Sequence, residues 1–258
     1  MSAFSSSLRF LHCLRHLDRL QQALSTGVRF TGHPVAFRPA DSHDHWSVLL
    51  GDLLPLLLSK LQQLGLPWES LSEDRRRAIV LGLGSVSAEI PMICFTEVPD
   101  GRSTAMHHYQ YGRYGLVVKR EWLELNNADR VLYVGDMSAV SKRVFRLVAA
   151  ANILGMHAPA GQPLFDNFTM RAALDLIAYV ENRQNLEEFE WRIAGRHGLM
   201  GGPRDTDTRL PLPLSFVETV FVSDEAELDD MKALVASLAS AQAVKHSPEV
   251  RCSDQAAA

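Results

Sequence analysis

The chain has 258 residues, of which 47% are hydrophobic and 22% are charged. This composition is typical of a folded globular protein that buries a large core without disulfides, and it excludes intrinsic disorder for most of the chain. The 26 Lys and Arg residues against 30 Asp and Glu residues give a net charge of −4, which does not favour a dedicated nucleic-acid binder.

The cysteines and the apolar stretches bear on the cellular setting. Cys13, Cys94 and Cys252 lie far apart without a CxxC motif, which argues against a disulfide framework or a zinc ribbon. A reducing, cytoplasmic setting is the natural interpretation. The most apolar stretch, Trp46 to Leu58, is shorter than the roughly 20 residues of a membrane-spanning helix. We therefore expect a cytoplasmic protein without a membrane partner.

Apolar periodicity predicts an α+β fold. The predicted elements, in chain order, are a strand over 8–12, a helix over 14–24 that stops at Gly27, a helix over 46–63 kinked near Pro55, a helix after Ser72, strands over 90–98, 114–119 and 130–134, helices over 138–154 and 168–181, strands over 187–194 and 216–222, and a helix over 225–238. Because strands and helices do not alternate regularly, we predict a mixed, mostly antiparallel sheet with flanking helices. We expect one domain over 1–240 and a disordered tail over 241–258.

The segment from Glu188 to Arg192 is the first candidate site. In a strand, alternate residues share a face, so Glu188, Glu190 and Arg192 point one way, while Phe189 and Trp191 point into a core. One glutamate can pair with the arginine, which leaves the other free to act on a ligand. The alternative is a solvated sheet face with a cross-strand salt bridge.

The segment from His107 to Gly115 is the second candidate site. It contains three tyrosines, two histidines and an arginine. These side chains suit stacking on a flat heteroaromatic ligand, and Gly112 and Gly115 would let the backbone turn or approach another segment closely. The alternative is a turn into an edge strand whose tyrosines cap the core.

Three further signals carry less information. The strand over 90–98 holds Glu97 near its end, which is either a site residue or a surface residue of a core strand. The histidine pairs at His43/His45 and His107/His108 lack an HExxH motif or a cysteine cluster, so we predict no metal site. The glycines at 82 and 84 make only a weak dinucleotide fingerprint.

The central motifs resemble a known family. The matching residues are Pro91 to Pro99, His108, Tyr111 to Leu116, Lys119 and Glu121-Trp122. They look like the pattern of the AbiGi family of abortive phage-resistance proteins, and Glu188-x-Glu190-Trp191-Arg192 is similar to that family's ExEWR segment. The resemblance covers residues 8–240 and implies a role in phage defence, either as a resistance protein or as an antitoxin.

The beginning of the chain has a second, more distant resemblance. Leu11-His12, followed by a helix and Gly27, is similar to the start of ADP-ribosyltransferase-like folds. In those folds such a first strand is followed by a second strand that carries a tyrosine and by a strand near the end of the domain that carries a glutamate. In this chain His12, Tyr114 and Glu190 occur in that order. Cys13 stands where those folds commonly have Thr or Ser. The resemblance implies an ADP-ribosyltransferase-like fold.

This second resemblance implies NAD as substrate and a macromolecule as acceptor. Glu190 would hold the nicotinamide ribose and stabilise the oxocarbenium-like transition state. Glu188 would orient or deprotonate the acceptor. Tyr114 completes the expected catalytic set.

The expected cofactor-binding residues are His12, Tyr111, His108, Arg192 and Arg113. The nicotinamide would stack on Tyr111 or on Tyr114. His12 would bond the adenosine-side ribose, and Arg192 or Arg113 would clamp the pyrophosphate.

Two other functions remain open. The chain is alternatively a non-enzymatic antitoxin that binds a protein partner of a defence pair, with the tyrosine-rich segment and the stretch from Trp46 to Leu58 as interface. A third interpretation is a metal-independent nuclease that uses His108, Tyr111, Glu190 and Arg192 at a phosphodiester.

Overall fold

A computed structural model describes residues 9–37, 50–84, 86–98, 110–134, 138–155, 175–182, 189–195 and 208–253 of the chain. Its α-helices are α1 (Leu17–Thr26), α3 (Leu54–Gln63), α4 (Glu73–Leu83), α6 (Arg120–Leu125), α7 (Ala139–Gly155) and α9 (Leu228–Ala241). Its strands are β1 (Arg9–Leu14), β2 (Val28–Arg29), β3 (Thr31–Phe37), β4 (Val86–Val98), β5 (Tyr114–Val118), β6 (Asp129–Arg130), β7 (Leu132–Val134), β8 (Val180–Asn182), β9 (Glu190–Ala194), β10 (Arg209–Leu210), β11 (Val217–Val222) and β12 (Glu249–Cys252).

The main sheet has eight strands in the order β12-β11-β5-β1-β4-β9-β6, with β3 also paired to β4. Its pairs are antiparallel except for β11 with β12, which run parallel. Two small sheets pair β10 with β2 and β7 with β8. The predicted α+β class with a mostly antiparallel sheet is therefore confirmed.

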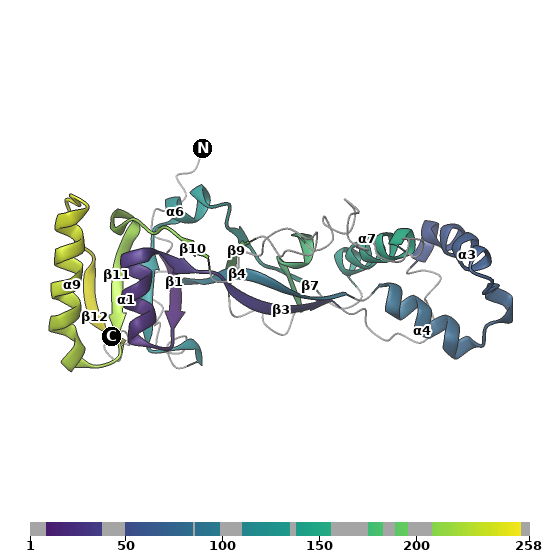
Figure 1. The fold of residues 1–258 in the computed structure, drawn as a ribbon, viewed down its shortest axis with the longest axis horizontal. Helices are drawn as coiled ribbons and strands as arrows, with labels where there is room; N and C mark the ends of the chain where they lie inside the picture. The colour runs from purple at the N-terminus through teal and green to yellow at the C-terminus, as the bar shows by residue number, and fades with distance from the viewer. Residues whose placement is uncertain are drawn as a thin grey trace.

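The long strand β4 connects the two ends of the molecule (Figure 1). Met92 pairs at once with Ala194 of β9 and with Thr31 of β3, so β3 lies on the edge of β4 opposite β9. This edge of β4, opposite β9, also pairs with β1 from Thr96 to Val98. β1 and β3 thus share one edge of β4 and part from each other between Met92 and Thr96.

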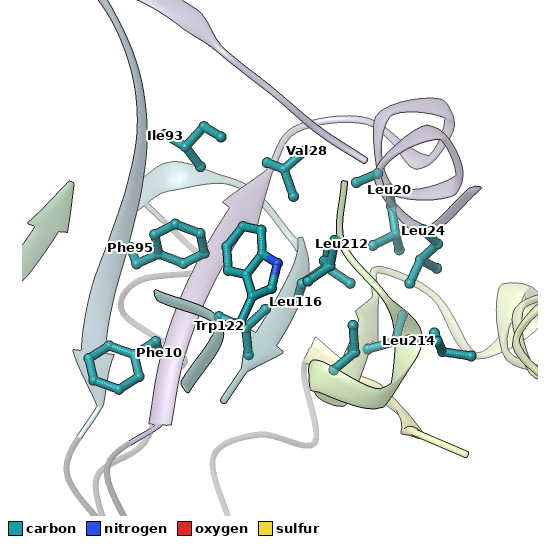
Figure 2. Packing of buried hydrophobic residues seen from close by; sticks show 14 of the residues in the cluster. Phe10, Leu20, Leu24, Val28, Ile93, Phe95, Leu116, Trp122, Leu212 and Leu214 are labelled. Carbon is teal, nitrogen blue, oxygen red and sulfur yellow. The ribbon is translucent and has the colours of Figure 1, made fainter. Parts of the chain in front are cut away.

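One end of the molecule, which we call the body, packs α1, α6 and α9 against the main sheet (Figure 1). Figure 2 shows the Trp122 indole beside Phe95 and close to Leu212. Trp122 is 2% exposed, meets the Phe95 ring edge-on with centroids 5.8 Å apart, and donates from Nε1 to the Pro211 carbonyl at 3.1 Å. A smaller cluster around Leu11 and Val117 covers the other face of the sheet.

The other end, which we call the helical lobe, packs α3, α4 and α7 together with the distal parts of β3 and β4 (Figure 1). Its core contains Leu57, Leu61, Val80 and Phe145, all at most 2% exposed. Gly84 fits against the Phe145 ring, where a Cβ would overlap the ring atoms. Helix packing, with few aromatic anchors, therefore builds this second core.

Several predicted helix ends are confirmed. Gly27 follows α1 with φ +104° and donates its N–H to the Ala23 carbonyl, as a C-terminal stop residue does. The Ser72 hydroxyl accepts from the Arg75 N–H at the start of α4. Asp224 forms a capping box with Glu227 ahead of α9.

Other predicted elements are wrong. The helix predicted over 46–63 lies partly outside the described residues, and from residue 51 it is a 3-10 turn (Gly51–Leu53) followed by α3. Pro55 lies in the first turn of α3, where a missing N–H costs no helical bond. The helix predicted to reach residue 181 gives way to β8, and the strand predicted over 130–134 is divided between β6 and β7. Residues 249–252 of the predicted disordered tail form β12, whose Cys252 is buried beside β11. A four-residue edge strand is too short to show apolar periodicity.

Candidate functional site

A cavity of about 590 Å³ opens where β1 and β3 part along β4. Its walls come from β1, the start of α1, the β2–β3 segment, the middle of β4, Tyr111, the first residue of β9 and β10. Its volume lies within the usual range of ligand sites. The cavity follows from the topology, because two strands that share one edge of β4 leave a gap between them.

His12 enters the cavity from β1 and is held in one tautomer. Its Nδ1 lies 2.8 Å from the Cys94 carbonyl oxygen, which can only accept, so Nδ1 carries the proton. Burial lowers the pKa of His12, against the opposing effect of this hydrogen bond and with a smaller contribution from His33. The neutral ring lies 5.3 Å from Phe95, and its Nε2 is left as a hydrogen-bond acceptor.

His33 is the second histidine of the cavity. Its Nε2 lies 2.9 Å from the Thr31 hydroxyl. Burial and the positive charge of Arg192 lower the pKa of His33, while the negative charge of Glu190 opposes them. Both imidazoles are therefore neutral near pH 7.

Glu190 lies at the start of β9 in a buried ion-pair network. It is 8% exposed, and Arg192 is 5% exposed. Arg192 donates from Nε to Glu190 Oε1 at 2.9 Å and from Nη2 to Oε2 at 2.7 Å. It also donates to Glu181 Oε1 at 2.6 Å and to the Ala178 carbonyl at 2.8 Å. Burial disfavours the guanidinium charge, but the hydrogen bonds and charge of Glu190 outweigh it and raise the pKa of Arg192.

The predicted sharing of one strand face by Glu190 and Arg192 is confirmed, since the two side chains bond each other. The alternative of a solvated face is wrong, because Glu190 and Arg192 are both buried. Its salt bridge between strands is present in another form, since Arg192 of β9 also pairs with Glu181 of β8. Arg192 uses its donors inside this network and does not line the cavity, so the structure does not place it as a pyrophosphate clamp. It instead fixes the carboxylate of Glu190.

The opposite face of β9 is structural. Ile193 is buried, and the Trp191 indole packs against the body core and donates to Glu97 Oε2 at 2.9 Å. Phe189, just before the strand, has φ +44° and accepts at its carbonyl from the Glu97 N–H. Glu97 thus anchors the beginning of β9 and lies outside the cavity lining.

Tyr111 reaches the cavity because the residue after it is a glycine. Gly112 has φ +139°, and a Cβ there would overlap the carbonyl of Leu14. The turn that carries Tyr111 therefore lies directly against the turn between β1 and α1. The predicted close backbone approach at Gly112 is confirmed.

Tyr114 and Arg113 lie elsewhere. The Tyr114 hydroxyl donates to Glu227 Oε1 at 2.9 Å, at the beginning of α9, and its ring packs against the body core. Burial and the Glu227 carboxylate raise the pKa of Tyr114. Arg113 is exposed, and neither residue lines the cavity. For Tyr114 the geometry favours the alternative of a tyrosine that caps the core.

Cys13 and Cys94 line the cavity as protonated thiols. Burial raises the pKa of Cys13 to about 12. Burial, together with the charge and hydrogen bond of Glu190, raises the pKa of Cys94 well above its ordinary value. Because the thiolate is the reactive form, neither side chain is set up as a nucleophile. Within the described ranges, no group of three or more His, Cys, Asp or Glu side chains could hold a metal ion.

The sequence analysis missed the basic side of the cavity. Arg15 and Arg19 at the start of α1, Arg29 of β2 and Arg209 of β10 all line it. Arg29 and Arg209 are 180 positions apart and meet only through the pairing of two-residue strands, which no periodicity reveals. Glu188 and His108, by contrast, were expected in the site and lie outside the described residues.

The comparisons with protein-family models, with curated proteins and with solved structures give no match for this chain. In the part of the chain that the structure describes, no helix has the length and apolar character needed to span a bilayer. The fold and the cavity thus define a coarse class, an α+β protein with a ligand-sized cavity beside a buried ion-pair network.

Proposed function

We propose that the chain is an ADP-ribosyltransferase-like enzyme of phage defence that transfers ADP-ribose from NAD to a macromolecule. One observation carries the proposal: His12, Tyr111 and Glu190, which come from three distant segments, line a single cavity of about 590 Å³. All three were expected from the sequence to contact NAD. Of the two tyrosines considered for stacking, Tyr111 is the one that lines the cavity.

The histidine and the tyrosine would bind the substrate. His12 offers the unprotonated Nε2 of a neutral imidazole, which can accept a hydrogen bond from a ribose hydroxyl. Tyr111 offers an aromatic face for the nicotinamide ring. The His12 ring is held by its hydrogen bond to the Cys94 carbonyl of β4, so it needs little reorganisation on binding. The backbone after Tyr111 is fixed where Gly112 lies against Leu14.

Glu190 would stabilise the transition state. In the proposed reaction the bond between ribose C1′ and the nicotinamide nitrogen breaks, and its electron pair leaves with nicotinamide. The positive charge that develops on the ribose would be stabilised by the fixed Glu190 carboxylate. The acceptor atom then bonds to C1′ and loses its proton to a base, for which we propose Glu188.

The test is NAD titration by calorimetry, followed by a nicotinamide-release assay on wild type and Glu190→Gln. We expect Glu190→Gln to bind NAD within a few-fold of wild type and to release nicotinamide at least about 100-fold more slowly. Glu218→Gln, at an exposed position of β11, is the matched control and should behave as wild type. Absence of binding at millimolar NAD, or full turnover by Glu190→Gln, would contradict the proposal.

Growth assays test the role in defence. A transferase should slow growth when expressed alone, and Glu190→Gln should restore it. A chain that is harmless alone and rescues cells from a toxin encoded beside it would instead support the antitoxin alternative.

A further inference from the structure

The arginines of the cavity form a cluster that the proposed reaction does not use. Arg15, Arg19, Arg29 and Arg209 line the cavity, and among the described residues Glu190 is the one carboxylate that lines it with them. That carboxylate is bound by Arg192 and, over the ranges that the structure describes, makes no ion pair with any of the four arginines. Among the described lining residues the arginines therefore outnumber the carboxylate, although the chain as a whole has a net charge of −4.

Two of these arginines face each other directly. Arg29 and Arg209 are register partners in the antiparallel pair of β2 and β10, and both are partly buried. Like charges at directly opposed positions destabilise a strand pair. An anion in the cavity that both side chains line would be attracted by both of them.

Arg209 is held in position by uncharged acceptors. Its Nη1 donates to the Gly27 carbonyl at 3.2 Å and its Nη2 donates to Gln22 Oε1 at 2.8 Å. Gly27, with φ +104°, lies so close to β10 that a Cβ would overlap the Leu210 carbonyl. These contacts fix the guanidinium without neutralising it, which is the condition of a pre-organised anion site.

The other two arginines stand at the beginning of α1. The N-cap residue His16 gives no side-chain hydrogen bond to this ten-residue helix, whose N-terminal dipole adds positive potential. Arg15 makes no ion pair with any residue in the described ranges, and the Arg19 contact with Asp18 is 4.0 Å long. Both side chains are exposed and able to close over a ligand.

We infer that these four arginines bind the diphosphate group of a small-molecule ligand. Planar guanidinium groups match phosphate oxygens in pairs, and four of them supply more positive charge than a carboxylate ligand needs. The inference reaches beyond the proposed function, since the same arginines suit a diphosphate whether or not NAD is the substrate.

The experiment measures binding of inorganic pyrophosphate and of ADP by calorimetry to the full chain. We expect both ligands to bind, and we expect raised salt to weaken binding because the contacts are ionic. Arg29→Gln and Arg15→Gln should each weaken the binding of both ligands about ten-fold or more. Arg143→Gln, on the exposed surface of α7 in the helical lobe, is the matched control and should leave binding unchanged.

Each outcome decides a separate point. No binding of pyrophosphate or ADP at millimolar concentration, or equal binding by wild type and both arginine variants, would overturn the inference. Arg15 is exposed, so Arg15→Gln keeps the test valid if Arg29→Gln fails to fold. If the chain binds diphosphate but releases no nicotinamide, the diphosphate site stands and the proposed transferase activity does not. If it releases nicotinamide and the KM for NAD is unchanged in both arginine variants, the transferase activity stands and the diphosphate site does not.

Discussion

The body and the helical lobe share the strand β4 but use it differently (Figure 1). In the body, Ile93 and Phe95 of β4 pack on Trp122 and on the helices, while the edge of the strand opens into the cavity. In the lobe, Ile90 and Met92 pack among the leucines of α3 and the residues of α7. No residue of α3, α4 or α7 lines the cavity. We infer that the lobe contributes to stability and the body carries the ligand chemistry.

The junction between the two regions contains the network of Arg192. Its partners Glu181 and Ala178 belong to the lobe side, and Glu190 belongs to the cavity. One guanidinium therefore connects the two regions, and its removal gives the largest effect that we expect.

Arg192→Met should lower the free energy of unfolding by about 3–5 kcal/mol, because it leaves two carboxylates close together without their cation. Urea denaturation measures this loss. Arg130→Met, which removes an exposed arginine on the neighbouring strand 3.9 Å from Glu97, is the control and should cost less than about 1 kcal/mol. Equal losses in the two variants would show that the network does not join the two regions.

Leucines of the two cores offer the next comparison. Leu57 of the lobe and Leu116 of the body are both fully buried, so Leu57→Ala and Leu116→Ala should each cost about 3 kcal/mol. Only Leu116 is a register partner of His12. Leu57→Ala should keep NAD or ADP affinity within two-fold of wild type, while Leu116→Ala should weaken it. A large loss of affinity in Leu57→Ala would contradict the division of roles.

Local features could be predicted from the sequence because they depend on neighbouring residues. The strand with His12, the stop at Gly27, the start of a helix after Ser72 and the shared face of Glu190 and Arg192 all follow from spacings of a few positions. Gly112 indicated a close backbone approach, and the structure shows that the segment approached is the end of β1 at Leu14.

Long-range pairings could not be predicted in this way. Arg29 meets Arg209, and Arg192 meets Glu181, only after the sheet order is set. Short strands such as β10 and β12 bury too few side chains to leave a periodic signal. The basic side of the cavity was therefore missed. Arg192 was expected to pair with a glutamate, which its hydrogen bonds to Glu190 confirm, but it was also expected to act as a pyrophosphate clamp, and its further bond to Glu181 was not predicted.

Gly112→Ala probes the backbone that brings Tyr111 to the cavity. We expect a loss of about 2 kcal/mol in stability together with weaker ligand binding, because φ is +139° and the added methyl group would overlap the Leu14 carbonyl. Gly82→Ala in α4 of the lobe is the matched control. It has open space around it, so it should raise stability by about 0.5–1 kcal/mol. Thermal unfolding measures the stability of both variants. A Gly112→Ala variant more stable than wild type would contradict the close contact between Gly112 and the Leu14 carbonyl.

The smallest expected effect is a dependence of the free energy of unfolding on pH, caused by the two histidines of the cavity. Burial lowers the pKa of His12 and of His33 below the ordinary value of 6.5, so below that pH the unfolded chain binds protons that the folded chain does not. Stability should therefore be full above pH 6.5 and should fall on acidification, by up to about 1.4 kcal/mol per pH unit for each histidine. Urea titrations between pH 7.5 and 5 measure the slope. His12→Gln should reduce this slope relative to wild type, because it removes one of the two histidines whose pKa is lowered by burial. An unchanged slope in His12→Gln would mean that the pKa of His12 is the same in the folded and the unfolded chain, which would contradict the lowering of that pKa by burial.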